Sequence, residues 1–125
     1  MKLLSLILIG IIALLHFYIA YFEMFAWEAR GPVAFPNFPD TLFADTVVLA
    51  GNQGIYNALL AVGLVWTLFI QDALWQKRIA SFFLMFVAIA GLYGAATASD
   101  RILFVQTIPA VLAFALLHLA KTKVT

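Results

Sequence analysis

Four long apolar segments dominate the chain and constrain its fold more than any other feature. They cover residues 3–26, 47–70, 79–98 and 102–120. A helix of about 20 apolar residues is long enough to cross the hydrocarbon core of a bilayer. Only helices and closed barrels can cross lipid, and the continuous rather than alternating apolar pattern favours helices. We therefore predict an all-α integral membrane protein, in which a single domain of residues 1–125 forms an antiparallel four-helix bundle.

Composition excludes the main alternatives. Hydrophobic residues make up 66% of the chain and charged residues 10%, whereas a soluble domain has about 25% charged residues. With a mean hydropathy of +1.07, the chain is neither a soluble globular protein nor a disordered one. A net charge of +1 provides no basic patch for nucleic acid. The absence of cysteine excludes thiolate metal sites and cysteine nucleophiles. A metal site would have to use the two histidines and six carboxylates, and since His16 and Glu23 are only two ligands at a wide spacing, we predict no metal site and leave any cofactor open.

The first apolar segment could also be interpreted as a signal peptide. Lys2 precedes an apolar stretch that extends to Leu15. However, a clean small-residue cleavage site is missing, and the apolar run continues beyond His16 for about ten residues. We therefore expect this segment to remain as a membrane span.

The connections between the spans differ in length and charge. Residues 27–46 contain three prolines and are predicted to form a long loop at the membrane interface, either a lid or a linker. Lysine and arginine predict the orientation, because they are enriched on the cytoplasmic side. Two of them, Arg30 and Arg101, lie on the side opposite the termini. The other five lie on the same side as the termini, and we therefore predict that the termini are cytoplasmic: Lys2, Lys77, Arg78, Lys121 and Lys123.

Polar residues gather in the outer half of this predicted bundle, while the inner half is predicted to be almost purely apolar. Glu23 lies about one turn from the outer end of the first span, and His16 lies near its middle. The two share a helix face and are about 10 Å apart along the axis, so that a small ligand or a water could lie between them. The other candidate ligand-binding residues are Asn52, Gln53, Tyr56, Asn57, Tyr93, Thr97 and Gln106.

Each candidate also has a structural interpretation. A single amide or hydroxyl in a span commonly forms an interhelical hydrogen bond, which contributes about 0.6 kcal/mol on average. The imidazole of His16 can be satisfied by a backbone carbonyl. Glu23 is the hardest to explain in this way, because a carboxylate at membrane depth must be protonated, paired or hydrated. We expect its carboxyl to point inward, within hydrogen-bond reach of Gln53, Asn57, Tyr93 or Gln106.

Small residues recur at a spacing of four on two of the spans. They are Ala50, Gly54 and Ala58 on the second span, and the pairs Ala90–Gly94 and Gly91–Ala95 on the third. This spacing lets helix backbones approach closely. The pattern leaves open whether the contacts are within the bundle or between subunits. On the fourth span, Pro109 has no N–H to donate to the carbonyl of Val105.

Several of these residues form motifs that resemble a known family. The motifs are His16-x6-Glu23-Met24-Phe25-x-Trp27, Gly51-Asn52-Gln53-Gly54-x-Tyr56-Asn57, Ala90-Gly91-x-Tyr93-Gly94-Ala95-x-Thr97 and Gln106-x2-Pro109. Over nearly the whole chain they resemble the family catalogued as domain of unknown function 1304, small four-span integral membrane proteins that are largely bacterial, with some fungal members. The resemblance implies the same fold and the inner membrane of a bacterium, and it assigns no activity.

Two functions are compatible with these residues. In the one we favour, the protein binds or helps to transport a small polar or amphipathic molecule in a polar cavity open to the outer face. Transport would require a homo-oligomer, because four helices are few for a conduit. In the alternative, the protein is a small membrane enzyme in which His16 and Glu23 act as acid and base on a lipid-soluble substrate. The predicted partners are the lipid bilayer and a small-molecule ligand.

Overall fold

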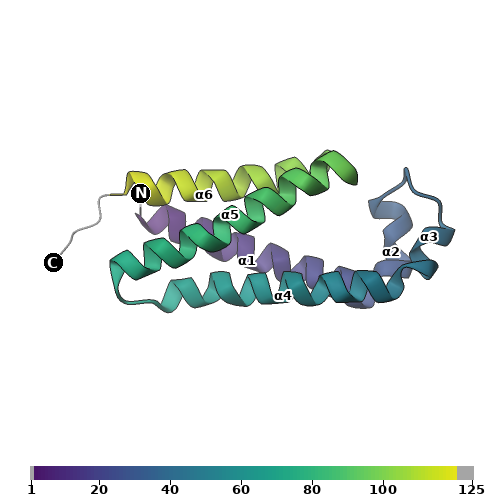
Figure 1. Ribbon diagram of the computed structural model, residues 1–125, viewed down its shortest axis with the longest axis horizontal. Helices are drawn as coiled ribbons and strands as arrows, with labels where there is room; N and C mark the ends of the chain where they lie inside the picture. The colour runs from purple at the N-terminus through teal and green to yellow at the C-terminus, as the bar shows by residue number, and fades with distance from the viewer. Residues whose placement is uncertain (1, 121–125) are drawn as a thin grey trace.

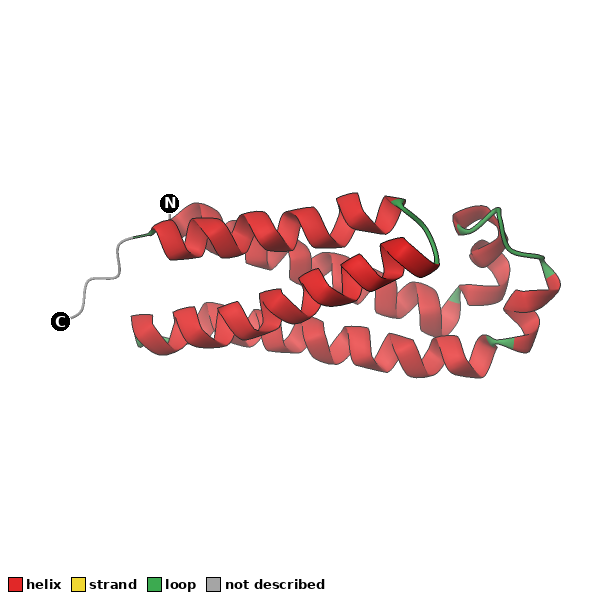
Figure 2. Ribbon diagram, turned by 45° about the horizontal axis from the view of Figure 1, so that its top comes forward, coloured by secondary structure: helices red, strands yellow, loops and turns green. Residues whose placement is uncertain are grey.

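The computed structural model describes residues 2–120, and in this range it consists of helices joined by short connections, without strands (Figures 1 and 2). The all-α prediction is confirmed, with four main helices, α1, α4, α5 and α6. The bounds are α1 Lys2–Phe25, α2 Trp27–Ala34, α3 Thr41–Asp45, α4 Val47–Phe69, α5 Ala73–Thr97, a π-helical turn η1 Leu103–Thr107, and α6 Ile108–Leu119.

Three of the helices, α1, α4 and α5, are long and apolar enough to cross a membrane. The helical run formed by η1 and α6, Leu103–Leu119, is also apolar but shorter. At 1.5 Å per residue it is about 25 Å long, slightly less than the hydrocarbon thickness of a typical bilayer. Together with the low content of charged residues, these helices mark the chain as an integral membrane protein.

The four main helices lie side by side along the long axis of the molecule (Figure 1). α1 packs mainly on α4, while α6 packs on both α1 and α5, and α4 meets α5 over a smaller area. The start of α1, the α4–α5 turn and the end of α6 lie together at what we call the terminal end (Figure 1). At the opposite end, the loop end, lie α2, α3 and the turn between α5 and η1.

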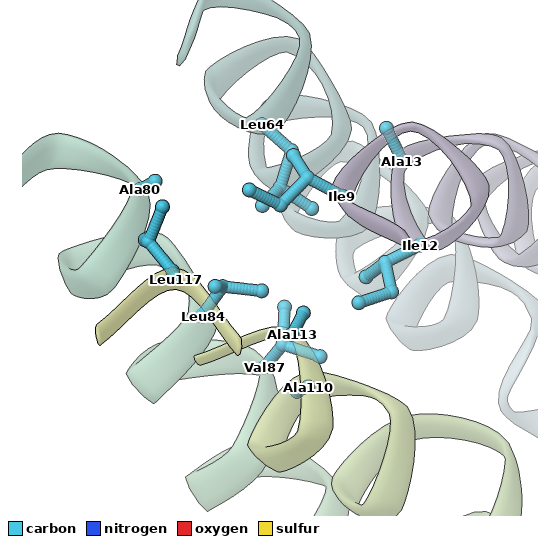
Figure 3. Packing of buried hydrophobic residues seen from close by; sticks show 10 residues of the cluster. All are labelled: Ile9, Ile12, Ala13, Leu64, Ala80, Leu84, Val87, Ala110, Ala113 and Leu117. Carbon is cyan, nitrogen blue, oxygen red and sulfur yellow. The ribbon is translucent and has the colours of Figure 1, made fainter. Parts of the chain in front are cut away.

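The apolar core lies between the four main helices (Figure 3). Its α1 members, Ile9, Ile12 and Ala13, belong to the first half of that helix, which is the half nearer the terminal end. Ile9 of α1, Leu64 of α4 and Leu84 of α5 are each 0% exposed. This location agrees with the prediction that the half nearer the termini is the more apolar one. The full cluster consists of Ile9, Ile12, Ala13, Leu64, Ala80, Leu84, Val87, Ala110, Ala113 and Leu117.

Buried polar residues at the terminal end correct the prediction that this half is almost purely apolar. Gln76 Nε2 donates to the carbonyl of Thr67 at 3.0 Å, and Thr67 Oγ1 donates to that of Leu64 at 2.7 Å. Ser5 Oγ donates to the carbonyl of Lys2 at 2.7 Å. Because each side chain reaches a backbone carbonyl, burial leaves none of them unpaired. Hydropathy alone does not detect such local pairing.

The third main helix begins earlier than predicted, at Ala73 instead of residue 79. Asp72 caps it, since its Oδ1 accepts a hydrogen bond of 2.8 Å from the backbone N–H of Trp75. Lys77 and Arg78, which we expected in a connection, are therefore part of α5. The predicted start marked the beginning of the apolar run, and a helix can begin before it. Lys121 and Lys123, which contribute to the orientation prediction, lie outside the described residues.

The segment between α1 and α4 is helical in two pieces, α2 and α3, and not the long loop we expected over residues 27–46. Trp27 Nε1 donates to Thr46 Oγ1 at 2.9 Å, which ties the first residue of α2 to the residue before α4. A Cβ at Gly31 would overlap the ring of Phe43, which is 1% exposed. The segment is thus a packed cap at the loop end. Its aromatic rings, Trp27, Phe35, Phe38 and Phe43, form a cluster together with Phe22 of α1.

Candidate functional site

A hydrogen bond between a carboxylate and an amide joins α1 to α4 toward the loop end. Asn57 Nδ2 donates to Glu23 Oε2 at 2.7 Å. The same nitrogen lies 3.3 Å from the carbonyl oxygen of Gln53, one turn earlier on α4, so that its own helix helps to orient the amide. Both side chains are half-buried. The prediction that Glu23 bonds a polar side chain of another main helix is confirmed, and of the four candidates the partner is Asn57.

Close packing of α1 and α4 brings these two side chains together. A Cβ at Gly54 would lie 3.0 Å from the carbonyl oxygen of Ala20 and would overlap the side chain of Met24. Ala20 and Ala50 are buried in the same contact zone, with exposed fractions of 4% and 6%. Gly54 therefore serves a contact within the chain, an alternative that the spacing of small residues had left open.

Glu23 has a second carboxylate oxygen, Oε1, that remains accessible. No donor among residues 2–120 forms a hydrogen bond with it, whereas Oε2 is bound by Asn57. Over the same range, no buried side-chain nitrogen or oxygen lacks a partner. Oε1 must therefore have accessible surface, and it can accept hydrogen bonds from a molecule that is not part of this chain.

His16 lies on the same helix and is 1% exposed. Its Nδ1 is 2.8 Å from the carbonyl oxygen of Ile12, and because a carbonyl only accepts, Nδ1 is the donor in this contact. Nε2 then has no hydrogen bond to residues 2–120, so by the same reasoning it keeps a small accessible area. His16 is not hydrogen-bonded to Glu23, as expected for two residues about two turns apart on one helix.

The other predicted residues do not form hydrogen bonds with Glu23. Thr97 is exposed, and its Oγ1 donates to the carbonyl of Tyr93 at 2.8 Å, within α5. Gln106 is half-buried in η1 beside Gly91, where an added Cβ would lie 2.8 Å from Cβ of Gln106. The remaining side chains are exposed on α4 and α5: Asn52, Gln53, Tyr56 and Tyr93.

The sequence indicated an irregular backbone near Pro109 but did not predict the π-helical turn η1. Pro109 marked this region through its missing N–H, and the helix preceding it widens, with the N–H of Ile108 bonded to the carbonyl of Leu103. Thr107 Oγ1 donates to the carbonyl of Ala88 in α5 at 3.3 Å, which attaches the turn to its neighbour. Such turns occur frequently at functional sites, and Gln106 lies within this one.

A cleft of about 190 Å³ at the loop end was not predicted from the sequence. It is lined by residues 34–38 of the cap and by residues 98–101 of the turn between α5 and η1. The predicted site residues are not part of this lining. The cleft depends on how the cap folds, and the sequence pattern predicted only a loop there.

Known proteins match nearly the whole chain. Residues 10–118 match the family described as "Protein of unknown function (DUF1304)". An uncharacterized protein, YpaA, from Lactococcus lactis subsp. lactis (strain IL1403) is 35% identical over 115 residues, which represent 90% of this chain and 95% of that protein. No solved structure matches the chain. The family match extends from α1 to α6 and includes every predicted site residue.

Proposed function

The chain belongs to the DUF1304 family, and we propose that it is a four-span membrane protein that binds, or helps to transport, a small polar or amphipathic molecule at Glu23. One observation carries the proposal. The half-buried carboxylate of Glu23 is held through Oε2 by Asn57 at 2.7 Å, while Oε1 has no donor among residues 2–120. A carboxylate at membrane depth is costly without a partner. An oriented carboxylate with one open oxygen can accept hydrogen bonds from a ligand or pair with its positive charge.

We propose an antiparallel topology in which α1, α4, α5 and the η1–α6 run all cross the bilayer. The grouping of helix ends at the terminal end supports it, as does the excess of lysine and arginine on that side. In this topology the terminal end is cytoplasmic and the loop end faces outward, which opens the Glu23 site to the outer face. The relative from a bacterium supports a location in the bacterial cell membrane.

The proposed site also includes His16, through Nε2, and the exposed polar side chains of α4, α5 and η1. Polar side chains within a span rarely face lipid, and instead line a hydrated cavity or contact another polypeptide. We therefore propose that a second copy of the chain encloses the cavity in a homo-oligomer. The proposed ligand-binding residues are His16, Glu23, Asn52, Gln53, Tyr56, Asn57, Tyr93, Thr97 and Gln106.

The enzyme hypothesis would use His16 and Glu23 as acid and base. Nδ1 of His16 is committed to the carbonyl of Ile12, and about two helical turns separate the two side chains. A substrate would have to extend from one to the other. Ligand binding requires only the open oxygen Oε1 of Glu23. We therefore prefer ligand binding to catalysis as the function.

A thermal-shift experiment tests the proposed function. The purified protein is incubated with a panel of small cations and polyols, including choline, ethanolamine, spermidine and glycerol, and its unfolding temperature is measured in detergent. We expect at least one compound to raise the unfolding temperature of the parent protein. Glu23→Gln should remove this shift and keep the fold, because a glutamine oxygen still accepts from Asn57.

Glu28→Gln is the matched control, since it makes the same change at an exposed acidic residue of α2. This variant should retain the full shift. An equal shift in the parent and in Glu23→Gln would contradict the proposal, as would a panel in which no compound stabilises the parent protein.

A further inference from the structure

A second surface, on α5 at the terminal end, combines positive charge with exposed aromatic rings. The guanidinium of Arg78 lies over the ring of Trp75, with Cζ 5.6 Å from the ring centroid. Trp75 is 55% exposed, so this pair lies on the outside of the bundle. Lys77 is the adjacent residue and brings a second positive charge to the same helical turn. Both cations are far from Glu23, which lies near the loop end of α1.

α6 adds polar groups at the edge of this surface. His118 Nδ1 donates to the carbonyl of Phe114 at 2.9 Å, and its ring stacks on that of Phe114 with a centroid distance of 4.2 Å. These contacts hold Nε2 at 3.5 Å from Ser81 Oγ of α5. Ser81 follows Lys77 by one turn and donates to its carbonyl at 2.7 Å. An imidazole and a hydroxyl thus lie one helical turn beyond Lys77 along α5.

An apolar strip continues from the basic group along α5. Phe82 and Phe86 follow Arg78 at positions i+4 and i+8, on the same helix face. They are 47% and 45% exposed, and their ring centroids are 4.3 Å apart. The surface therefore has a cationic part near the helix end and an aromatic part that runs along the helix axis toward the middle of the bundle.

The distribution of charged residues along the chain indicates the sign of the charge that a partner of this surface carries. Asp72 is the single acidic residue of the terminal side, and its Oδ1 already accepts from the N–H of Trp75. Four acidic residues, by contrast, lie around the loop end, namely Glu28, Asp40, Asp45 and Asp100. Asp72 is thus the one carboxylate of this side, against the two positive charges of Lys77 and Arg78, and an anion from outside the chain would complement this excess.

We propose that this surface binds an anionic phospholipid of the surrounding bilayer. The phosphate lies against Lys77 and Arg78, the ester groups of the glycerol backbone reach Ser81 and His118, and an acyl chain follows Phe82 and Phe86. Guanidinium groups pair with phosphate in two parallel hydrogen bonds, and basic pockets between membrane helices recognise anionic head groups. The aromatic strip distinguishes a lipid from a soluble anion, because only a lipid has an apolar chain to place there. This inference is independent of the function proposed for Glu23.

Native mass spectrometry of the full chain in detergent tests the proposal. The protein is titrated with phosphatidylglycerol and with phosphatidylethanolamine of identical acyl chains. We expect several-fold greater retention of phosphatidylglycerol, and loss of that preference in a variant that combines Lys77→Gln with Arg78→Gln. A variant with Phe82→Ala and Phe86→Ala should retain less of both lipids.

Arg101→Gln is the matched control, because it removes an exposed arginine at the loop end and should keep the preference. Equal retention of the two lipids by the parent protein would overturn the proposal. So would a loss of the phosphatidylglycerol preference in Arg101→Gln as large as that in the variant combining Lys77→Gln with Arg78→Gln. Inorganic phosphate is tested alone in a thermal-shift measurement, and stabilisation equal to that by phosphatidylglycerol would exclude lipid as the specific ligand. If the double variant does not fold in detergent, the single variant Arg78→Gln replaces it, and an unchanged preference for phosphatidylglycerol in Arg78→Gln would overturn the role of this guanidinium in selecting an anionic lipid.

Discussion

Asn57 of α4 donates a hydrogen bond of 2.7 Å to Glu23 of α1, and so joins two residues that are 34 positions apart in the sequence. The bond forms where Gly54 allows the two helices to approach closely. It lies on the loop-end side of the apolar core and holds one carboxylate oxygen while the other stays accessible. The pair thus links the packing of α1 against α4 to the orientation of the candidate binding group.

A double-mutant cycle measures the strength of this bond. We expect Glu23→Ala and Asn57→Ala to be coupled by about 1 kcal/mol, within the range found for hydrogen bonds between membrane helices. The measurement is the free energy of unfolding in detergent for the parent, both single variants and the double variant. A cycle of Glu23→Ala with Asn52→Ala, an exposed residue of the same helix, should give coupling near zero. Equal coupling in both cycles would contradict a specific pair.

Two glycines of α4 should respond to alanine in opposite directions. A Cβ at Gly54 would meet Met24 and the carbonyl of Ala20, whereas a Cβ at Gly51 has no neighbour within 4 Å. Gly54→Ala should therefore lower the free energy of unfolding by about 1–3 kcal/mol through overpacking. Gly51→Ala should raise it by up to about 1 kcal/mol, because alanine is the better helix former. Thermal unfolding of the two variants provides the comparison, and equal effects would show that α1 does not pack against Gly54.

The fold was largely predictable because apolar length carries the main signal. The four apolar runs predicted the four main helices, and the depth of Glu23 predicted its bond to another helix. The cap was not predictable, since its helices depend on contacts such as that between Gly31 and Phe43, which no local pattern encodes. The buried pairing of Gln76 with the carbonyl of Thr67 was missed for the same reason. For exposed polar residues such as Tyr93, whose side chain forms no hydrogen bond within residues 2–120, a role in ligand binding stays a prediction.

The cap should loosen when its closest contact is disturbed. Gly31→Ala places a methyl group where the ring of Phe43 lies, so Phe43 must move and the aromatic cluster must repack. We expect faster hydrogen exchange over residues 27–46 with unchanged protection in α5. Ala29→Ser, at an exposed position of α2, serves as the control and should leave exchange unchanged. Unaltered exchange in Gly31→Ala would mean that the cap does not depend on this contact.

Topology can be mapped without background labelling, because the chain has no cysteine. Asn37→Cys lies in the connection between α2 and α3, and Gln71→Cys lies in the turn between α4 and α5, and both positions are exposed. A membrane-impermeant maleimide added to intact cells should label Asn37→Cys alone. Permeabilised cells should show labelling at both positions. Labelling of Gln71→Cys in intact cells would invert the proposed orientation and would place the Glu23 site on the cytoplasmic side.

The most direct test of the account is chemical footprinting of Glu23 in reconstituted bilayers. Dicyclohexylcarbodiimide, an apolar reagent that modifies carboxyl groups within membranes, is applied with and without the compound that stabilises the parent protein, and modification is located by mass spectrometry. Because Oε1 is accessible and belongs to the proposed binding site, Glu23 should be modified, and the compound should slow that reaction without slowing modification of the exposed Glu28. An unreactive Glu23, or a rate of modification that the compound leaves unchanged, would contradict the assignment of Glu23 as the ligand-binding carboxylate.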